Sequence, residues 1–297
     1  MKRDFETIAL TGKQTDPRVV ESLRLLVPHL LEAGRRVILD EAVSIDFDHL
    51  PVERLPRQSL VEEADLLVAI GGDGTMLYAN RLAAGAGLPL LGINRGRLGF
   101  LADIGTDEML DRVSEVLAGQ YAEEHRLMLQ AELDDGDQTL RCMALNDVVL
   151  QRRETGRMLD FETWIDGAYV NTHGGDGLVV ATPTGSTAYA LSGGGPILHP
   201  GTGAIAVVPI CPHTLSDRPL VVGADAEIEV RLVENADTTS EVICDGRVLG
   251  ELLAGHRLRI TRAPCPAILI HPLDHDYFRI LRSKLHWGRG NRGQGGL

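Results

Sequence analysis

The first 120 residues switch between two spacings of apolar positions. Short apolar runs have the length of buried strands, and longer segments carry apolar side chains at helical spacing. The expected strands are residues 7–10, 36–39, 66–70 and 88–93, and the expected helices are residues 19–33, 75–84 and 107–117. Alternation of strands and helices is typical of βαβ units. The pattern therefore predicts a Rossmann-like α/β domain with a mostly parallel sheet over residues 1–121.

The pattern changes after residue 121 to consecutive strands joined by turns. Asp-Gly pairs at 166–167 and 245–246 lie between apolar stretches, which is a strong hairpin signal. We expect an all-β sandwich over residues 122–272. A return segment over 273–287, with a short helix at its end, would pack on the first domain, and the glycine-rich residues 288–297 would form a disordered tail.

Residues 71–75 read Gly-Gly-Asp-Gly-Thr and follow the 66–70 strand. A glycine turn that leads into a helix gathers free backbone N–H groups, and such a point favours phosphate. Asp73 is unusual there, because a carboxylate repels phosphate unless it binds a metal or accepts a proton from an attacking hydroxyl; both tasks belong to phosphoryl transfer. The alternative is a tight turn with Thr75 as an ordinary N-cap.

Two further groups of polar residues are candidates for ligand binding. Residues 182–192 combine hydroxyl side chains with a predicted helical turn, which suits sugar or phosphate oxygens, and Tyr189 could stack on a base. The alternative is a Thr- and Ser-rich connection between strands. Asn146 and Asp147 interrupt an apolar strand, either as a bulge or as groups that face a ligand. Asp176, between glycines, is either a turn residue or a ligand contact.

Composition narrows the classes of partner. The chain of 297 residues has a formal charge of −13, which argues against a nucleic-acid surface. No secretory signal is recognisable, and no apolar run approaches the ~20 residues of a membrane span. The four cysteines form no Cys-x-x-Cys motif, so we expect isolated thiols in a reducing cytoplasm. His271 and His275 have the spacing of helix-borne zinc ligands, but Pro272 lies between them, and we interpret both as surface or interface histidines.

Three motifs, in this order, resemble those of bacterial NAD kinases. They are Gly-Gly-Asp-Gly-Thr at 71–75, Leu-Asn-Asp at 145–147 and Thr-Pro-Thr-Gly-Ser-Thr-Ala-Tyr at 182–189. Residues 94–101 and 212–219 also resemble segments of this family. Lipid kinases and phosphofructokinases carry related versions of the first motif, so the third motif is the one that selects NAD kinases. The resemblance extends over nearly the whole chain, excluding the glycine-rich tail.

The resemblance implies an N-terminal α/β domain, a C-terminal β-sandwich and an active site in the cleft between them. It implies transfer of the γ-phosphoryl group of ATP to the 2′-hydroxyl of the adenosine ribose of NAD, which gives NADP. A divalent cation, typically Mg²⁺, would take part, with no direct protein ligand assigned. The protein would be a cytoplasmic homo-oligomer, a dimer or a tetramer, without nucleic-acid or membrane partners.

The resemblance also implies roles for individual residues. Asp73 would be the general base, and the phosphate loop would comprise Gly71, Gly72, Gly74 and Thr75. Asp73 and Gly74 would contact the ribose, and Asn146 and Asp147 would hold the adenosine. The remaining contacts to NAD would come from Arg157, Gly174, Asp176, Thr187, Ala188, Tyr189, Ala190, Leu191, Ser192 and Arg247.

The chain departs from the family pattern at three positions. Gly174 stands where relatives can have Arg, Arg247 stands where Gln is common, and Asp147 replaces the Glu of some members. The first two departures place a charge contact and a side-chain contact to NAD in doubt. None of them removes the proposed base.

Two other functions are compatible with parts of the sequence. A diacylglycerol-type lipid kinase would share the glycine loop and the two-domain layout, but the acidic balance and residues 182–189 count against it. A non-catalytic dinucleotide sensor would bind NAD without forming a product. Asp73 disfavours the sensor, because a pure binder has no use for a carboxylate beside phosphates.

Overall fold

A computed structural model describes residues 3–13, 16–41, 43, 45, 47, 49–96, 99–134, 136, 138–153, 158–233 and 239–287. Contacts within the chain divide it into two compact units. Unit 1 consists of the described residues up to His125 and from Ile268 onward, and unit 2 is Arg126–Ala267. Unit 1 is therefore built from both ends of the chain.

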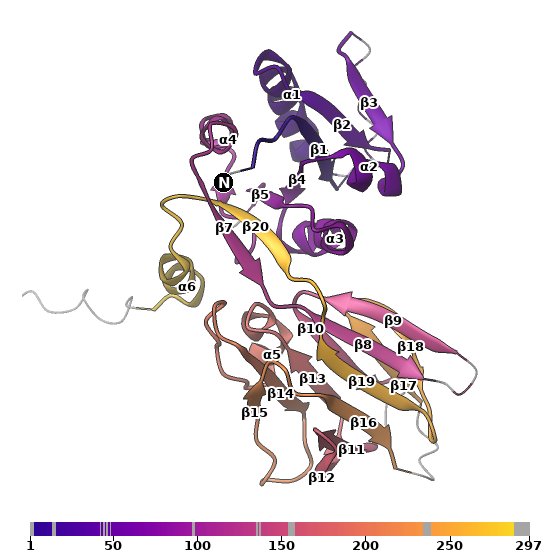
Figure 1. Ribbon diagram of the computed structural model, residues 1–297. Helices are drawn as coiled ribbons and strands as arrows, with labels where there is room; N and C mark the ends of the chain where they lie inside the picture. The colour runs from indigo at the N-terminus through magenta and orange to yellow at the C-terminus, as the bar shows by residue number, and fades with distance from the viewer. Residues whose placement is uncertain are drawn as a thin grey trace, which may run out of the picture. The chain divides into compact units, whose positions relative to one another are not determined.

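Unit 1 is a sheet of strands in the order β3-β2-β1-β4-β5-β20-β7, with β6 paired to β5 (Figure 1). The registers from β3 to β20 are parallel. The strands are β1 (Thr7–Gly12), β2 (Arg36–Asp40), β3 (Val52–Leu55), β4 (Leu66–Gly71), β5 (Leu90–Asn94), β6 (Ile104–Gly105), β7 (Tyr121–Arg126) and β20 (Ala267–Pro272). The helices are α1 (Pro17–Glu32), α2 (Arg57–Glu63), α3 (Asp73–Ala83), the short 3₁₀ helix η1 (Ala84–Ala86), α4 (Met109–Leu117) and α6 (Tyr277–Leu285).

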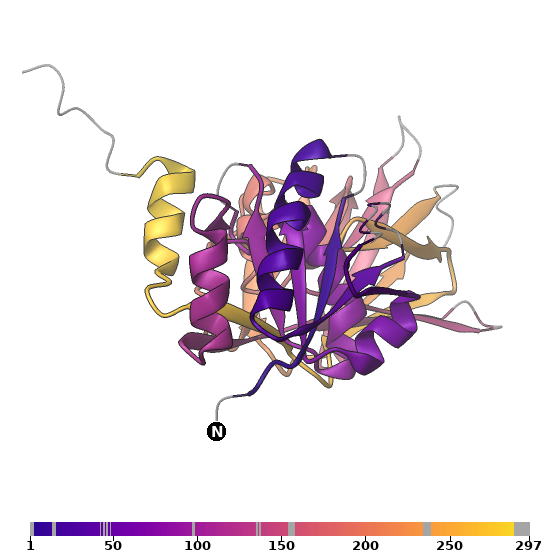
Figure 2. The same ribbon diagram turned by 90° about the horizontal axis from the view of Figure 1, so that it is seen from above.

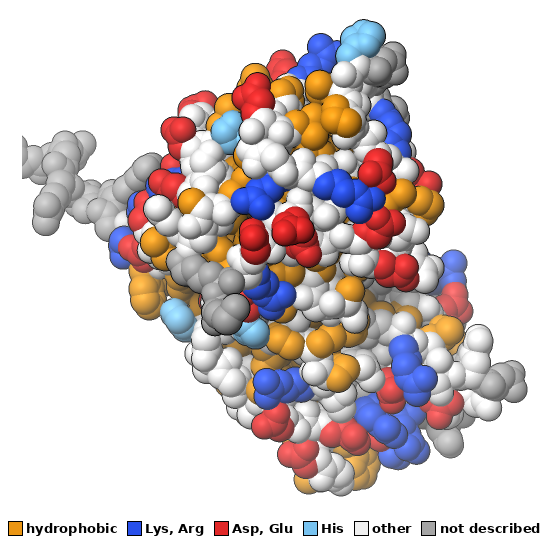
Figure 3. Space-filling model, turned by 45° about the horizontal axis from the view of Figure 1, so that its top comes forward, with side chains coloured by type: hydrophobic (Ala, Val, Ile, Leu, Met, Phe, Trp, Pro, Cys, Tyr) orange, Lys and Arg blue, Asp and Glu red, His pale blue; other side chains and the backbone are white. Residues whose placement is uncertain are grey.

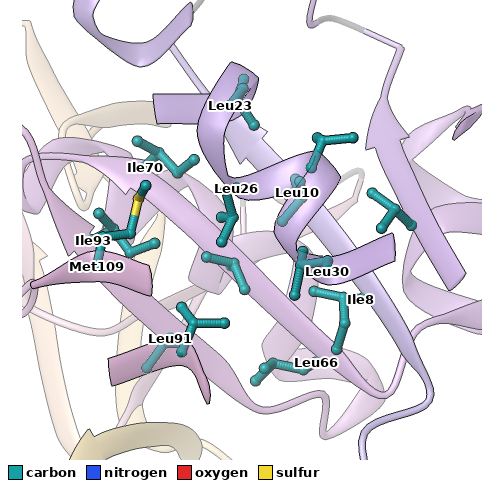
Figure 4. Close-up of a cluster of buried hydrophobic side chains, with 14 of the residues drawn as sticks. Ile8, Leu10, Leu23, Leu26, Leu30, Leu66, Ile70, Leu91, Ile93 and Met109 are labelled. Atoms are coloured by element: carbon teal, nitrogen blue, oxygen red, sulfur yellow. The ribbon is translucent and has the colours of Figure 1, made fainter. Parts of the chain in front are cut away.

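The core of unit 1 lies between the sheet and the pair α1 and α4, which lie side by side in Figure 2. Helix α1 begins where the Asp16 side chain accepts the N–H of Arg18, with Pro17 at the first helical position. Its apolar stripe, including Leu23, Leu26 and Leu30, packs on the apolar strands (Figure 4). All six residues of β4 are buried, which explains why this strand reads as an unbroken apolar run.

Unit 2 is a sandwich of two antiparallel sheets, and the predicted fold class is thereby confirmed. One sheet has the order β15-β14-β13-β10-β17-β18 and the other β12-β11-β16-β19-β8-β9. The strands are β8 (Leu129–Asp134), β9 (Thr139–Ala144), β10 (Asp147–Arg152), β11 (Leu159–Ile165), β12 (Ala168–Gly175), β13 (Gly177–Ala181), β14 (Ala204–Ile210), β15 (Leu220–Gly223), β16 (Ile228–Leu232), β17 (Ser240–Cys244), β18 (Arg247–Leu252) and β19 (Arg257–Arg262). Two short helices, η2 (Gly185–Thr187) and α5 (Tyr189–Ser192), follow β13.

The first of these sheets is apolar on both faces. Alternate residues of β10 and β13 face the sandwich core, and the intervening ones, such as Val149 and Val179, pack with Ala190 of α5 on the other face. Both predicted hairpins form, with positive φ at both residues of each Asp-Gly turn. Such turns match the twist of the flanking strands.

Several boundaries differ from the expected ones. Strand β7 extends the first unit to residue 125, and β20 returns the chain to it at residue 268, before the expected return segment 273–287. The helix expected at 283–287 is α6, which begins at Tyr277 behind the Asp276 N-cap. His271, expected at a surface or an interface, is buried because every residue of β20 is covered.

Surface charges of both signs are interspersed over the face seen in Figure 3. Arg36, for example, lies 2.7 Å from both Glu53 and Glu63. Within the described residues, none of the helices has the length and apolar character that crossing a bilayer would require.

The expectation of isolated thiols is wrong for two cysteines. Cys142 of β9 and Cys244 of β17 form a disulfide across a sequence separation of 102 residues. It joins one sheet of the sandwich to the other, since the two strands belong to different sheets. Cys211 and Cys265 are free. Sequence spacing did not reveal the pair, because the fold alone brings these strands together.

A bond that closes so long a loop restricts the unfolded chain. We expect reduction, or the substitution Cys142→Ala, to lower the Tm by ~5–15 °C, corresponding to ~2–4 kcal/mol. Thermal unfolding with and without dithiothreitol measures this, and Cys211→Ala is the matched control. Equal Tm values for the wild type in both buffers would contradict the prediction.

Candidate active site

The glycine loop occupies the carboxyl end of β4 and the first turn of α3. Gly71 is the last, buried residue of the strand, and Gly72 is the helix N-cap without a side-chain hydrogen bond. Thr75 lies inside the helix, where its N–H bonds the Gly72 carbonyl, so it is not the N-cap. The first N–H groups of a helix have no partner within it and carry the positive end of the helix dipole. This end of α3 is suited to an anion.

The Asp73 carboxylate is held by the loop that follows β5. Its Oδ2 accepts the N–H of Phe100 at 3.0 Å, and its Oδ1 accepts the N–H of Leu101 at 3.1 Å. Gly99 permits this approach, because a Cβ there would lie 2.0 Å from Oδ1. Both oxygens keep a further lone pair, so the carboxylate is fixed in orientation and still able to accept a proton.

A pocket of about 440 Å³ opens beside this helix end. Gly72, Gly74 and Thr75 line it, so three of the four predicted phosphate-loop residues face it. The other lining residues are Gly12, Lys13, Asp40, Arg57 and Tyr78. Lys13 and Arg57 add positive charge to that of the helix end, and Asp40 is the one acidic residue among these lining residues, so the pocket presents more positive than negative charge.

Tyr78 forms an aromatic wall of the pocket. Its hydroxyl donates to Asp40 Oδ2 at 3.2 Å, and Thr11 donates to the same oxygen at 3.0 Å. Burial, and then the charge of Asp40, raise the pKa of Tyr78, so its hydroxyl remains a donor. Arg57 and Arg81 lie 5.2 and 5.8 Å from the centre of the ring.

The second group of predicted residues gathers in unit 2 around Asp245. One oxygen of its carboxylate accepts the N–H of Leu145 at 2.7 Å, and the other accepts those of Asn146 at 2.8 Å and Asp147 at 3.2 Å. Asn146 therefore lies in a bend between β9 and β10, rather than within a strand as expected, and Asp147 is the first residue of β10. The bend turns this segment toward the end of the sheet.

Hydrogen bonds hold residues 182–187 against the same bend. Thr182 Oγ1 donates to the Leu145 carbonyl at 2.5 Å, and the Thr182 N–H donates to the Asn146 carbonyl at 2.9 Å. Gly185 lies against the Asn146 backbone, where a Cβ would come within 2.0 Å of the carbonyl oxygen. Buried Arg126 donates to Thr184 Oγ1 at 3.2 Å. The second and third motifs are thus joined by hydrogen bonds and by close contact of their backbones.

Asp147 is buried beside a second carboxylate. Its residue is 7% exposed, and burial, followed by the charge of Asp245, raises the pKa of Asp147 to about 7. Near neutral pH the group exists in both protonation states. It can therefore donate a hydrogen bond to a sugar oxygen or accept one from a sugar hydroxyl.

The rest of the predicted contacts divide by position. Tyr189, 42% exposed, and Ser192 are open to solvent, Thr187, Ala188 and Leu191 are partly buried, and the side chain of Ala190 is packed on the sheet. Arg247 is exposed, directly after the turn that carries Asp245. These residues lie in or next to the segments that form the Asp245-centred cluster.

Gly174 and Asp176 are not part of that cluster. They precede β13, whereas Thr182 follows it, so about 17 Å of strand separates the two groups. Asp176 instead pairs with Arg152 at 3.0 Å. Arg157 lies outside the described residues.

Sequence reasoning missed the groups that hold the site together. Asp245 was noted only as a turn residue, and nothing local marks a carboxylate that bonds residues about 100 positions earlier. Lys13 and Arg57 carry no motif, and Arg57 begins helix α2, which the sequence pattern does not predict. Arg126 lies in a predicted strand region, where a buried arginine has no sequence signal.

Two groups of polar residues, one suited to a polyphosphate and one to sugar hydroxyls, place the chain among phosphotransferases with an alcohol as acceptor. Comparison with family models identifies the family of phosphotransferases to which the chain belongs. Residues 24–121 match the ATP-NAD kinase N-terminal domain, and residues 145–272 match the ATP-NAD kinase C-terminal domain. The chain belongs to the ATP-NAD kinase family, which decides against a diacylglycerol-type lipid kinase.

Full-length relatives and solved structures agree. The chain is 46% identical over 290 residues to an NAD kinase of Nitrosococcus oceani, covering 97% of this chain and 99% of the relative. It is 41% identical to an NAD kinase of Hydrogenovibrio crunogenus, covering 96% and 99%. A yeast NADH kinase complexed with NADH is similar with a TM-score of 0.90 and 26% identity, covering 99% of this chain and 91% of the other. An Archaeoglobus fulgidus NAD kinase in complex with ATP has a TM-score of 0.70 and 25% identity, covering 94% and 98%.

The raised pKa of Asp147 makes stability depend on pH. Folding favours its protonated form, so this contribution is complete below the unfolded pKa of 3.8 and is lost as the pH rises through about 7. The difference amounts to at most about 4 kcal/mol. We expect Asp147→Asn, which mimics the neutral acid, to gain stability relative to the wild type between pH 5 and pH 8.

Denaturant unfolding at both pH values measures this gain. Asp160→Asn, at an exposed acid of the same unit, is the control and should follow the wild type. If the free energy of unfolding changes between pH 5 and pH 8 by the same amount in Asp147→Asn as in the wild type, the raised pKa does not belong to Asp147.

Proposed function

We propose that this chain transfers the γ-phosphoryl group of ATP to the 2′-hydroxyl of the adenosine ribose of NAD, giving NADP and ADP. The observation that carries the proposal is the Asp73 carboxylate, held by two N–H groups next to the anion-binding end of α3. The names of the full-length relatives support the same reaction.

Asp73 acts as the general base in this proposal. The ribose hydroxyl is a poor nucleophile near neutral pH, and Asp73 accepts its proton as the oxygen–phosphorus bond forms and the bond between the γ-phosphorus and the ADP oxygen breaks. Proton transfer of this kind contributes typically ~10²–10⁴-fold to the rate. Positioning and neutralisation of charge supply most of the remaining acceleration.

The triphosphate of ATP occupies the pocket beside α3 in this proposal. Backbone N–H groups at Gly72 and Gly74, with Lys13 and Arg57, would neutralise its charge. The Archaeoglobus fulgidus relative, solved in complex with ATP, supports ATP as the donor. Gly71, as the buried strand end, contributes shape rather than a contact.

Mg²⁺ fits this pocket through oxygen donors. Such ions in kinase sites keep several waters and bind mainly through substrate phosphates and one or two carboxylates. Asp40 is the carboxylate that lines the pocket, and Asp73 lies at the adjoining helix end. When bound, the ion would neutralise charge on the phosphate oxygens.

NAD is held by unit 2 in this proposal. Asn146 and Asp147 bind the adenosine ribose and base through hydrogen bonds, and Tyr189 stacks on a ring. Thr187, Ala188, Leu191, Ser192 and Arg247 line the same ligand. Gly174 and Asp176, at the opposite end of β13 from Asp147, would contact another part of the dinucleotide. Arg157 would supply a further contact to NAD.

Two further expectations complete the proposal. We propose a homo-oligomer, for which light scattering coupled to size-exclusion chromatography is the direct measurement. We also propose a cytoplasmic location, as we expect for a member of the ATP-NAD kinase family.

Asp73→Asn tests the base. We expect turnover to fall ~10²–10⁴-fold while NAD binding persists, because an amide cannot accept the proton. NADP formation, read with an NADP-specific coupled dehydrogenase, measures turnover, and calorimetry measures NAD binding. Near-normal turnover would remove Asp73 from the mechanism, and NAD binding without NADP formation by the wild type would favour the sensor.

Asp65→Asn is the matched structural control. Asp65 accepts two backbone N–H groups, from Glu6 at 3.1 Å and Thr7 at 2.8 Å, much as Asp73 does. It lies on unit 1 outside the pocket's lining residues. We expect Asp65→Asn to lose about as much stability as Asp73→Asn and to keep the turnover of the wild type.

Arg57→Ala tests the ATP pocket. Loss of a charge-assisted contact to phosphate, worth ~1.5–3 kcal/mol, should raise the KM for ATP by ~10–100-fold and leave the KM for NAD unchanged. Arg81→Ala is the control, because Arg81 lies over the same Tyr78 ring but does not line the pocket. Steady-state kinetics that show equal effects of the two substitutions would place ATP elsewhere.

A further inference from the structure

Three side chains that the proposed reaction does not use converge in unit 1. Asp103 follows the loop that holds Asp73, His271 lies in β20, and His275 lies between β20 and α6. Asp103 Oδ2 is 3.1 Å from His271 Nδ1 and 2.5 Å from His275 Nδ1. One ligand atom from each of the three lies within 4.8 Å of the others. The cluster is enclosed, with side-chain exposures of 9%, 2% and 15%.

The second observation is an unsatisfied oxygen. Asp103 Oδ1 is buried and has no hydrogen-bond partner among the described residues. A buried carboxylate oxygen without a partner loses its hydration without compensation. It therefore marks a place where a cation would be bound favourably.

The two imidazole rings lie together beside these carboxylates. Glu124 Oε2 lies 3.2 Å from His271 Nε2, the ring nitrogen that does not face Asp103. The His271 side chain is 2% exposed, and its ring is stacked on the His275 ring with centroids 3.9 Å apart. Both Nδ1 atoms therefore face the same carboxylate oxygen in an enclosed place.

A divalent cation at this place would take both Nδ1 atoms as ligands, and His271 Nε2 would then face Glu124. A carboxylate that accepts the outer N–H of a ligating histidine is the usual way in which proteins orient such ligands.

We propose that Asp103, His271 and His275 form a binding site for Zn²⁺, with Glu124 as the carboxylate that orients His271. Two imidazoles and one carboxylate are a donor set of zinc, whereas Mg²⁺ prefers oxygen alone. The site is distinct from the ATP pocket, with which it shares no lining residue.

The position of the site gives the ion a structural role. Asp103 lies two residues after Leu101, whose N–H holds Asp73, and Ala102 accepts a hydrogen bond from Asn94 at 3.1 Å. Lys284 of α6 lies 5.8 Å from the centre of the Phe100 ring. The ion would therefore join the C-terminal segment to the loop that orients Asp73.

The test is titration of the metal-free full chain, dialysed against EDTA, with Zn²⁺ alone in a calorimeter. We expect one equivalent to bind and the Tm to rise. His275→Gln should weaken binding more than the ~10–100-fold that loss of an outer-shell partner costs, and Glu124→Gln should weaken it by about that factor. Co²⁺ in place of Zn²⁺ should give visible d–d absorption that His275→Gln abolishes.

His29→Gln, the same substitution at a histidine that bonds Ser114, is the control and should bind as the wild type does. Thermal unfolding of the metal-free variants verifies that they are folded. Less than one equivalent bound by the wild type, or equal affinity of His275→Gln, overturns the proposal. The titration contains neither ATP nor NAD, so its outcome is independent of the proposed reaction.

Discussion

Much of unit 2 depends on one carboxylate that accepts three consecutive backbone N–H groups. Asp245 sits at positive φ in a tight hairpin turn and receives the N–H groups of residues 145–147. These groups would otherwise be buried without partners, which costs free energy for each of them. The hairpin that ends β17 therefore fixes the bend before β10, and Thr182 and Gly185 are fastened to that bend. The negative charge of Asp245 also contributes to the raised pKa of Asp147.

Unit 1 also contains a carboxylate that is held by backbone N–H groups, but this carboxylate has a different role. Asp73 accepts two N–H groups, one on each oxygen, and both oxygens keep a lone pair. Asp245 accepts three and is 8% exposed. The first carboxylate is oriented and remains available to a substrate, whereas the second is consumed by the backbone. Asp65 also accepts two N–H groups, both on one oxygen, so the position of Asp73 at the start of α3, and not the number of N–H groups, marks it as the candidate base.

The parts of the fold that follow from local patterns were predictable from the sequence. Continuous apolar runs gave the buried parallel strands, and Asp-Gly pairs gave the hairpins, because both signals lie within a few neighbouring residues. The bend at Asn146, the Cys142–Cys244 pair and the burial of His271 arise from contacts between segments distant in sequence. The glycine loop was found because phosphate binding requires a local backbone shape, whereas Lys13 and Arg57 reach the pocket from separate elements.

The sheet of unit 1 contains a strand from the far end of the chain. Strand β20 lies between β5 and β7 (Figure 1). Strand β6 pairs with the end of β5 at Ile93 and Asn94, but the part of that edge at Leu90 and Leu91 stays uncovered until β20 has been synthesised. Unit 2, which is continuous, has all its strands available earlier on the ribosome. Unit 2 can therefore complete its fold before unit 1, although most of unit 1 is synthesised first. Until then, unit 1 keeps an open edge in its parallel sheet. A nascent chain stalled between the two would expose that edge to pairing with another chain.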